Sequence, residues 1–199
     1  MSRSALLLCD LQGAILTHLP EEKRAGLLAK AVSVLTAARE HAGEHGPLLV
    51  VHVGIKFRAG CPELSPTNKS FNALKKGGFA ETFVEGNPAS DYAPEVAPKE
   101  GEIQISKRRV GAFSTTDLQT VLSSCGVTKI YLAGSATSGV ILSTVRDAAD
   151  RDYSIVVISD ACADREADVH NMLIEKVFPR QADIMTVDEF LAAANSGKL

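Results

Sequence analysis

The chain has 199 residues, of which 45% are hydrophobic and 23% charged, and its formal net charge at pH 7 is −3. This length and composition favour one globular domain over residues 1–199. The slight negative charge argues against binding to nucleic acid or to a membrane surface, because both need clustered positive charge. The start of the chain lacks the pattern of a signal peptide and no apolar run could span a bilayer, so we expect a cytoplasmic protein with four reduced cysteines.

Short apolar runs alternate with longer amphipathic stretches along the chain. The predicted elements are, in order, strand 4–9, helix 21–45, strand 48–53, helix 68–76, strand 102–106, helix 116–125, strand 129–133, helix 138–151, strand 153–159, helix 166–178, strand 183–185 and a last helix opened by a capping box at 186–189. Continuous apolar strands indicate a parallel sheet covered on both faces. The alternation therefore predicts an α/β fold that is doubly wound, with three α/β/α layers and a Rossmann-like topology.

The segment 54–101 interrupts this alternation. It is rich in Gly, Pro and Asn, and only 68–76 is predicted to be helical. A loop of this length inside a compact domain usually has a function, such as a lid or a partner surface. Phe57 in this segment is expected to line a pocket or to meet a neighbouring subunit, and an ordered surface loop is the alternative interpretation.

Two charged residues come directly after predicted strands. Asp10 follows the first strand, with Gln12 two residues later, and Lys107 follows the third strand. Ligands of open α/β sheets bind at the carboxyl ends of the strands, where partial desolvation raises the pKa of an acid and suits it to proton transfer. Lys107 could pair with Asp10 or hold an anionic intermediate. Taken singly, the commoner roles are a turn cap for Asp10 and a solvated charge for Lys107.

A turn of small residues joins strand 129–133 to helix 138–151. It consists of Gly134, Ser135, Ala136, Thr137, Ser138, Gly139 and Val140. Small residues let a ligand approach the backbone, and the following helix offers free N–H groups to an anion. The alternative is a simple turn in which Thr137 or Ser138 caps the helix.

Three segments in register, "LLLCDLQ", "ISKRRVGAFSTTDLQTVL" and "LAGSATSGVILSTVRDAADRDY", resemble the isochorismatase-like hydrolases, also called the cysteine hydrolases. The match covers nearly the whole chain and ends with "VVISDACAD". The resemblance implies a six-stranded parallel sheet, a homodimer or homotetramer, a cis peptide bond before Ala136 and a catalytic Asp, Lys and Cys. Asp10 and Lys107 match the first two. The residues expected to bind the substrate are Gln12, Phe57, Arg109, Ser135, Ala136, Thr137, Ser138 and Gly139.

The sequence departs from the family pattern at the cysteine. That residue lies six positions after the glycine that closes the strand, here Gly134, and the position holds Val140. Thr144 and Asp147 match the family and fix the register. Covalent amide hydrolysis needs a thiolate, so cysteine-dependent amidase activity is disfavoured. A branch of the family without the cysteine cleaves a vinyl ether by protonating its enol carbon, but valine is larger than the glycine of that branch and leaves less room for a cyclohexadiene ring.

Three functional hypotheses follow. The leading one is a hydrolase of a small, anionic molecule that uses no covalent nucleophile, with Asp10 as proton donor or acceptor, Lys107 as its charged partner and the turn up to Val140 as an anion cradle. The second is a catalytically silent module that binds a small molecule or a protein. The third is acyl transfer by Ser138, for which helix capping is the more common role.

No metal and no other cofactor are expected. The metal-dependent members of the family carry an Asp-x-His motif and a further His after the second strand, and the run from His52 to Phe57 lacks such a triad. His52, on an apolar strand, is expected to be a hydrogen-bonded core histidine. His170 is expected on a helix face without a partner.

Overall fold

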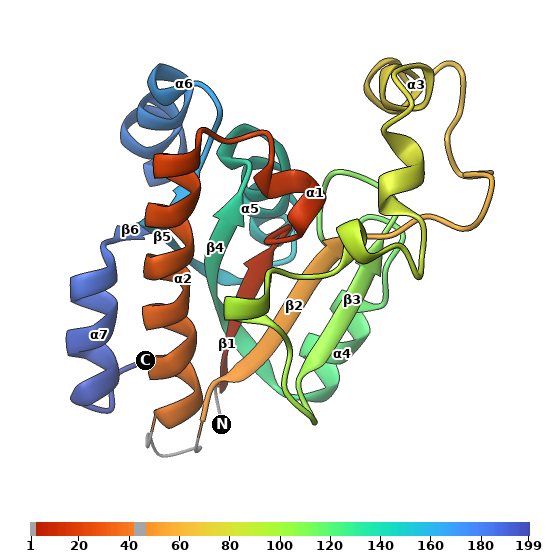
Figure 1. The fold of residues 1–199 in the computed structure, drawn as a ribbon. Coiled ribbons are helices and arrows are strands. Elements are labelled where there is room, and N and C mark those ends of the chain that lie inside the picture. The colour runs from red at the N-terminus through yellow and green to blue at the C-terminus, as the bar shows by residue number, and fades with distance from the viewer. Residues whose placement is uncertain (1–2, 42–46) are drawn as a thin grey trace.

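The structure, a computed structural model, describes residues 3–41 and 47–199. Its described part forms a six-stranded, all-parallel sheet with the order β3-β2-β1-β4-β5-β6 (Figure 1). The strands are β1 (Arg3–Cys9), β2 (Leu49–Ile55), β3 (Ile103–Lys107), β4 (Val127–Ser135), β5 (Ser154–Ala163) and β6 (Asp183–Met185). The order reverses between β1 and β4, so the chain leaves these two strands toward opposite faces and a crevice opens between their carboxyl ends.

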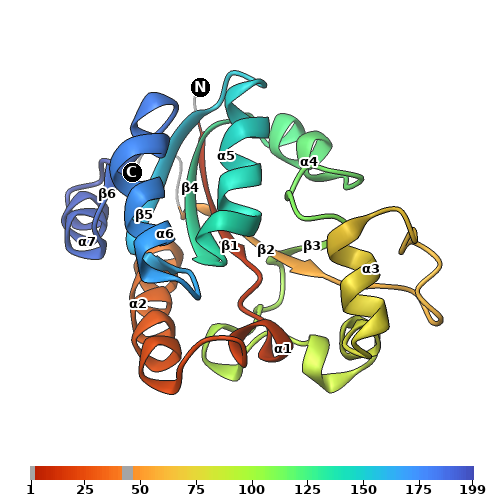
Figure 2. The same ribbon diagram turned by 90° about the horizontal axis from the view of Figure 1, so that it is seen from above.

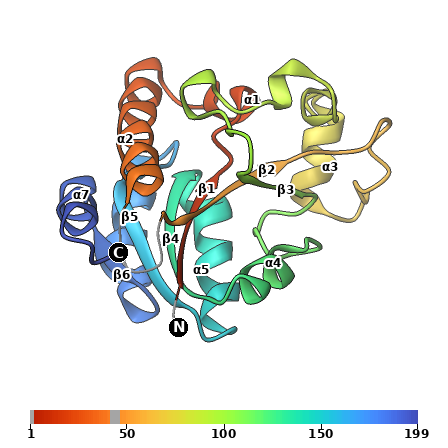
Figure 3. The same cartoon turned by 90° about the horizontal axis from the view of Figure 1, so that it is seen from below.

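Helices cover both faces of the sheet, which confirms the predicted three-layer α/β/α arrangement. One face carries α2 (Glu21–Glu40) and α7 (Val187–Asn195), and the other carries α4 (Leu118–Ser124) and α5 (Leu142–Ala149) (Figures 2 and 3). The remaining helices are α1 (Gly13–Leu16), α3 (Lys69–Lys76) and α6 (Ala167–Met172), with π turns at Thr137–Ile141 and Leu173–Val177 and 3-10 turns at Ala80–Phe83, Pro88–Ser90, Pro94–Val96 and Phe178–Arg180.

The central strand β1 is apolar on both of its faces. Leu6 and Leu8 pack in a cluster with residues of α2 and α7, whereas Leu7 and Cys9 pack in a second cluster with residues of α4 and α5. Successive side chains of a strand point to opposite faces, so a continuous apolar run needs helices on both sides. Each fully buried leucine contributes roughly 1.5–3 kcal/mol to folding, and the two clusters fix the end of β1, where Asp10 follows.

Most element boundaries differ by one or a few residues from the predicted ones, and three of the differences are as follows. The long helix ends at Glu40, five residues before the predicted end, and residues 42–46 lie outside the described part. The short helix α1 was not predicted. Strand β5 continues to Ala163 through the polar pair Ser159 and Asp160, because the Asp160 carboxylate accepts hydrogen bonds from Lys30 of α2 and from the first N–H of α7.

The segment 54–101 is an ordered part of the fold and lies beside the carboxyl ends of β2 and β3 (Figure 1). It has its own apolar cluster, made of Ile55, Phe57, Cys61, Leu64, Phe71, Ala80 and Phe83. Ion pairs of Arg108, which follows β3, with Glu63 and Glu85 tie it to the rest of the fold. Across the described residues, none of the helices combines the length and the apolar character that a membrane crossing requires.

Candidate active site

Two buried charged residues meet at the carboxyl edge of the sheet. Lys107 Nζ donates a hydrogen bond to Asp10 Oδ2 at 2.9 Å, and the two residues are 1% and 5% exposed. Asp10 follows β1, where its backbone takes a φ of 56° and its N–H donates to the Val53 carbonyl at 2.8 Å. Asp is among the few residues other than Gly that tolerate this conformation. Lys107 ends β3, so its long side chain reaches across β2 to the carboxylate.

The Asp10 carboxylate is buried and only one of its two oxygens has a hydrogen-bond partner among the described residues. Burial raises its pKa above the usual range, and the adjacent Lys107 ammonium opposes that shift. The second oxygen, Oδ1, is buried without a hydrogen-bond partner in the part of the chain that the structure describes. Buried polar atoms are nearly always paired, so an orphaned oxygen beside a cavity indicates a place for a ligand.

A cavity of about 240 Å³ lies over this pair, at the reversal point of the sheet. Its walls are mainly apolar and come from Ile15, Leu19, Ile55, Phe71, Val110, Ala136, Gly139 and Val140. Besides Asp10 and Lys107, its polar lining residues are His18, Ser135 and Arg165. A mainly apolar pocket with a few polar and charged groups is typical of a small-molecule site.

No thiol lines this cavity among the described residues. Val140 is 1% exposed and forms part of the wall. Cys9 is buried, and burial together with the neighbouring Asp10 raises the pKa of its thiol well above the ordinary value. Burial also raises the pKa of Cys162, to about 12, and its Sγ donates to the Leu132 carbonyl. Both thiols are therefore held in the protonated form, which is a poor nucleophile.

The turn after β4 differs from the predicted anion cradle. The Ser138 N–H donates to Asp164 Oδ2 at 2.7 Å, so the protein's own buried carboxylate occupies the helix start. The Ser138 side chain is exposed and does not line the cavity. The predicted caps Thr137 and Ser138 are wrong, since Ala136 holds the cap position of a π turn without a side-chain cap hydrogen bond.

Thr137 instead pairs with His170, for which the sequence showed no partner. Its hydroxyl lies 2.8 Å from His170 Nδ1. The peptide bond between Ser135 and Ala136 is cis, as the family resemblance suggested. Gly134 has a φ of 137°, and a Cβ there would lie 1.9 Å from the Cys9 carbonyl oxygen, so only glycine lets β4 pass this close to β1.

Like Thr137 and Ser138, three further residues expected to bind the substrate do not line the cavity. The Gln12 side chain is fully buried and hydrogen-bonds to both backbone groups of Ile55 and to the Ser90 carbonyl, which ties β1 to β2 and to the segment 54–101. Phe57 is buried in the core of that segment, and its backbone hydrogen-bonds with Phe83 and Glu85. The Arg109 guanidinium lies over the Phe71 ring at 5.8 Å. None of the three lines the cavity.

The cavity also contains residues that the sequence did not point to. Arg165 follows β5 and is exposed, with its own neighbour Glu166 as an ion-pair partner at 3.6 Å. Because β5 was predicted to end at 159, this arginine was not placed at the carboxyl edge of the sheet. His52 agrees with the prediction of a hydrogen-bonded core histidine, since its Nε2 lies 2.9 Å from Glu102 Oε2. Among the described residues, no cluster of three His, Cys, Asp or Glu side chains is placed to hold a metal ion.

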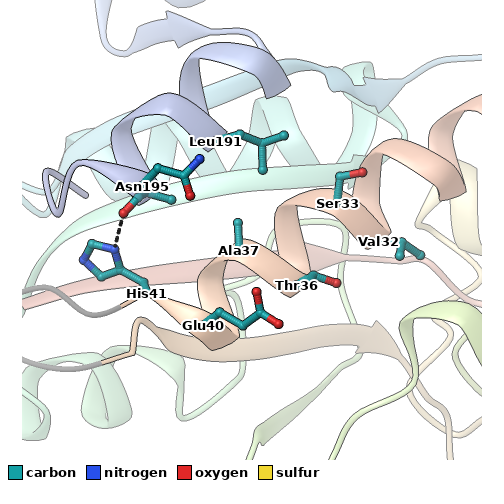
Figure 4. A pocket seen from close by; sticks show the side chains of 9 residues that line it. Val32, Ser33, Thr36, Ala37, Glu40, His41, Leu191 and Asn195 are labelled. Atoms are coloured by element: carbon teal, nitrogen blue, oxygen red, sulfur yellow. Dashed lines mark hydrogen bonds between the residues drawn. The ribbon is translucent and has the colours of Figure 1, made fainter.

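A larger groove of about 350 Å³ lies between α2 and α7 (Figure 4). Its lining includes Ser33, Glu40 and Leu191, and the His41 ring packs against the C-terminal turn of α7 with Nδ1 3.2 Å from the Ala194 carbonyl oxygen. The groove contacts neither Asp10 nor Lys107 and lies away from the carboxyl edge. The smaller cavity, which holds the buried charge pair, is therefore the candidate active site.

Comparison with known proteins agrees with this arrangement. The family model of the isochorismatase domain matches residues 4–189. A maleamate amidohydrolase from Pseudomonas putida is 30% identical over 165 residues, which cover 83% of this chain and 70% of that protein. A Pseudomonas chlororaphis protein named "Probable isochorismatase" is 30% identical over 192 residues, covering 94% of this chain and 84% of that protein. The crystal structure of a cysteine hydrolase from Pseudomonas syringae has the same fold, with a TM-score of 0.85 at 20% identity over 98% of this chain and 93% of that one. The chain belongs to the isochorismatase family.

Proposed function

We propose that this protein is a hydrolase of small anionic enol ethers and that it works without a covalent nucleophile. The observation that carries the proposal is the buried pair of Asp10 and Lys107, 2.9 Å apart in a cavity that Val140 lines and no thiol reaches among the described residues. Val140 then occupies the place of the cysteine that the amide-cleaving members use. A carboxyl group that can be protonated supports acid catalysis, and burial shifts the pKa of Asp10 in that direction.

In the proposed mechanism, the protonated Asp10 carboxyl donates its proton to the terminal carbon of the enol ether. The ether carbon becomes an oxocarbenium ion, while the Lys107 ammonium stabilises the carboxylate that remains. Water adds to this carbon and returns a proton to Asp10. The hemiketal then collapses to an alcohol and a ketone, so one water molecule is consumed and Asp10 is regenerated.

Arg165 takes over the anion-binding role that we had expected of Arg109. It is an exposed cation at the cavity, whereas the charge of Lys107 is already balanced by Asp10. A guanidinium binds a carboxylate through two hydrogen bonds. The names of two relatives support a small anionic substrate, since one is named for maleamate and the other for isochorismate, and only the second of these is an enol ether.

The test uses two enol ethers, isochorismate and the smaller 2-methoxyacrylate, and one amide, maleamate. We expect hydrolysis of an enol ether and no hydrolysis of maleamate. The Asp10→Asn variant is expected to lose about 10²–10⁴-fold in kcat, as other enzymes do when a general acid is removed. Equal rates in Asp10→Asn and in the unchanged protein would refute the proposal.

A catalytically silent binding module is the second candidate, and Val140 is the observation that favours it. It predicts no turnover of the three compounds together with a rise in melting temperature when one of them binds. Turnover that depends on Asp10 would exclude this candidate.

We further propose that the chain forms one domain over residues 1–199 and works in the cytoplasm as a homodimer or homotetramer. The match of the family model to residues 4–189 supports a single domain. The four free cysteines support a reducing compartment such as the cytoplasm. Sedimentation of the purified protein measures the oligomeric state, and a monomer at micromolar concentration would contradict the proposed oligomer.

A further inference from the structure

The amine of Lys107 has surroundings that few lysines share. The side chain is 2% exposed, and Nζ donates hydrogen bonds to Asp10 Oδ2 at 2.9 Å and to the Arg109 carbonyl at 3.1 Å. Lys107 nevertheless lines the cavity, next to apolar residues such as Ile55 and Val110. An amine held out of water beside a proton acceptor has the environment of lysines that attack carbonyl carbons.

We propose that Lys107 forms an imine with the carbonyl carbon of a small 2-oxo acid. This activity goes beyond the hydrolysis proposed above and uses the same cavity. It requires a lysine that reaches the cavity, a group that moves protons to and from the carbonyl oxygen, and a contact for the substrate carboxylate.

The volume, the apolar walls and the charge of the cavity indicate the class of substrate. The cavity volume of about 240 Å³ equals that of about eight water molecules at ~30 Å³ each, which admits pyruvate and leaves room for a longer carbon chain. The apolar walls fit a short carbon chain. Arg165 adds an exposed guanidinium to the lining, which fits the carboxylate of a 2-oxo acid.

Asp10 is the proton carrier for this reaction. The amine must lose a proton before it can attack, and Asp10 Oδ2 accepts one across the 2.9 Å hydrogen bond. The transfer turns an ion pair into two neutral groups, and a buried site penalises neutral groups less than charged ones. Burial raises the pKa of Asp10, which favours the same direction of transfer.

The bonds and protons balance as follows. Nζ forms a bond to the carbonyl carbon, and the carbonyl oxygen takes the proton that Asp10 received. Asp10 then removes a proton from the nitrogen and gives it to the hydroxyl group, which leaves as water. The products are one water molecule, an iminium ion on Lys107 and a carboxylate on Asp10, so the net charge of the pair is unchanged.

Val140 has no nucleophilic atom, so it does not compete with the Lys107 amine for the carbonyl carbon of the substrate. A thiol at this position would present a second nucleophile opposite Asp10 and would draw the proton of the carboxyl pair into thiol chemistry. The described lining of the cavity holds an amine and no thiol. The same substitution that argues against covalent amide cleavage therefore favours chemistry at Lys107.

The experiment traps the iminium ion in the full-length protein. The protein is incubated with pyruvate, sodium borohydride is added to reduce the iminium ion to a stable secondary amine, and the labelled lysines are mapped by peptide mass spectrometry. Lys30 is the internal control, because it also pairs with a carboxylate, that of Asp160, but has a 45% exposed side chain outside the cavity. We expect labelling of Lys107 to exceed that of Lys30 by about tenfold or more, although Lys30 is far more accessible.

Three variants define the roles of the residues. Lys107→Arg is expected to abolish the label at this position. Arg165→Met is expected to lower the pyruvate label on Lys107 by about tenfold and to leave the label from the neutral ketone acetone unchanged, because only pyruvate carries a carboxylate. Arg180→Met, which changes an exposed arginine outside the cavity, is expected to alter neither label.

Labelling of Lys107 at or below the level of Lys30 would overturn the proposal, and this comparison needs no variant that must fold. An Asp10→Asn variant that labels as fast as the unchanged protein would remove Asp10 from the mechanism. The proposal of an imine and the proposal of enol-ether hydrolysis are refuted by different results. Enol-ether turnover without trapping leaves hydrolysis standing, and trapping without enol-ether turnover leaves the imine standing.

Discussion

The carboxylate of Asp164 accepts a hydrogen bond of 2.7 Å from the backbone N–H of Ser138, so β5 and its following loop hold the turn that starts α5. Asp164 is 5% exposed, and its other oxygen accepts a longer hydrogen bond from the Glu166 N–H. The turn lines the cavity through Ala136, Gly139 and Val140. One carboxylate thus positions a wall of the candidate active site without lining that cavity.

Replacing Asp164 by alanine should therefore destabilise the protein. Loss of a buried, charge-assisted hydrogen bond costs about 1.5–3 kcal/mol, and the Ser138 N–H is left unpaired. Urea unfolding measures the change, with Glu166→Ala, a change of an exposed neighbour, as the matched control. Equal stabilities of the two variants would contradict the structural role of Asp164.

The buried pair of Asp10 and Lys107 predicts a non-additive result. Removal of one partner, as in Asp10→Leu, leaves a buried charge and should cost about 3–5 kcal/mol. In the double variant Asp10→Leu with Lys107→Met, both charges are gone, and the stability should recover most of that loss while activity stays absent. Urea unfolding of the single and double variants completes the cycle, and additive losses would argue against a direct pair.

Glu102 predicts how the stability depends on pH. Burial alone would raise its pKa, but hydrogen bonds from Arg39, the Lys99 N–H and His52 outweigh that effect and lower the pKa to about 2. The unfolded value is about 4.3, so the folded protein prefers the carboxylate and this stabilisation is fully present above the unfolded value. It is lost as the pH falls from the unfolded value toward 2.

The matching experiment compares melting temperatures of the unchanged protein and Glu102→Gln between pH 2 and 7. The difference between the two proteins should be largest near neutral pH and should shrink as the pH falls below 4. A difference that does not change over this range would show that Glu102 does not titrate with a lowered pKa.

Two glycines provide a matched pair for a backbone test. Gly134→Ala places a methyl group 1.9 Å from the Cys9 carbonyl oxygen at a φ of 137°, so we expect a loss of more than about 3 kcal/mol or no folded protein. Gly26→Ala lies in α2 with no atom within 4 Å of the new Cβ, and should gain up to about 1 kcal/mol. Thermal unfolding of both variants checks the expected opposite signs.

Val140→Cys should create an amidase. The new thiol would lie in the cavity wall with Asp10 and Lys107, the groups that produce a thiolate in cysteine hydrolases. We expect hydrolysis of maleamate that iodoacetamide blocks. Val110→Cys, which adds a thiol to the same cavity at a 39% exposed position, should remain inactive. Activity in both variants, or in neither, would count against the alignment of Val140 with the family cysteine.

The sequence predicts those parts of the site and the fold that depend on neighbouring residues along the chain. The strand before Asp10 is a continuous apolar run, and the strand that leads to Lys107 alternates apolar and polar residues. Parallel strands end at a common edge, so the convergence of the two residues was foreseeable. The alternation of strands and helices likewise indicated the layers of the fold. These features depend on a few neighbouring residues and on the period of the apolar pattern.

The remainder depended on contacts between distant residues. Ser159 and Asp160 looked like the end of a strand, and only Lys30 and the start of α7 show why β5 continues and carries Arg165 to the cavity. Ser138 was predicted to bind an anion through its backbone N–H, but the structure shows that the Asp164 carboxylate accepts this hydrogen bond. Phe57 pairs through its backbone with Phe83 and packs in the cluster of the segment 54–101, contacts that no local pattern reveals.

The ion pair of Asp10 and Lys107 joins the ends of two strands that are not neighbours, with β2 between them. The site therefore cannot exist in a partly assembled sheet, because both flanking strands must have docked on β2 in register. A folding intermediate that lacks β3 would carry an unpaired acid at the end of β1, without the Lys107 amine. The candidate active site can therefore act only after β1, β2 and β3 have all docked, and an intermediate without β3 has no activity.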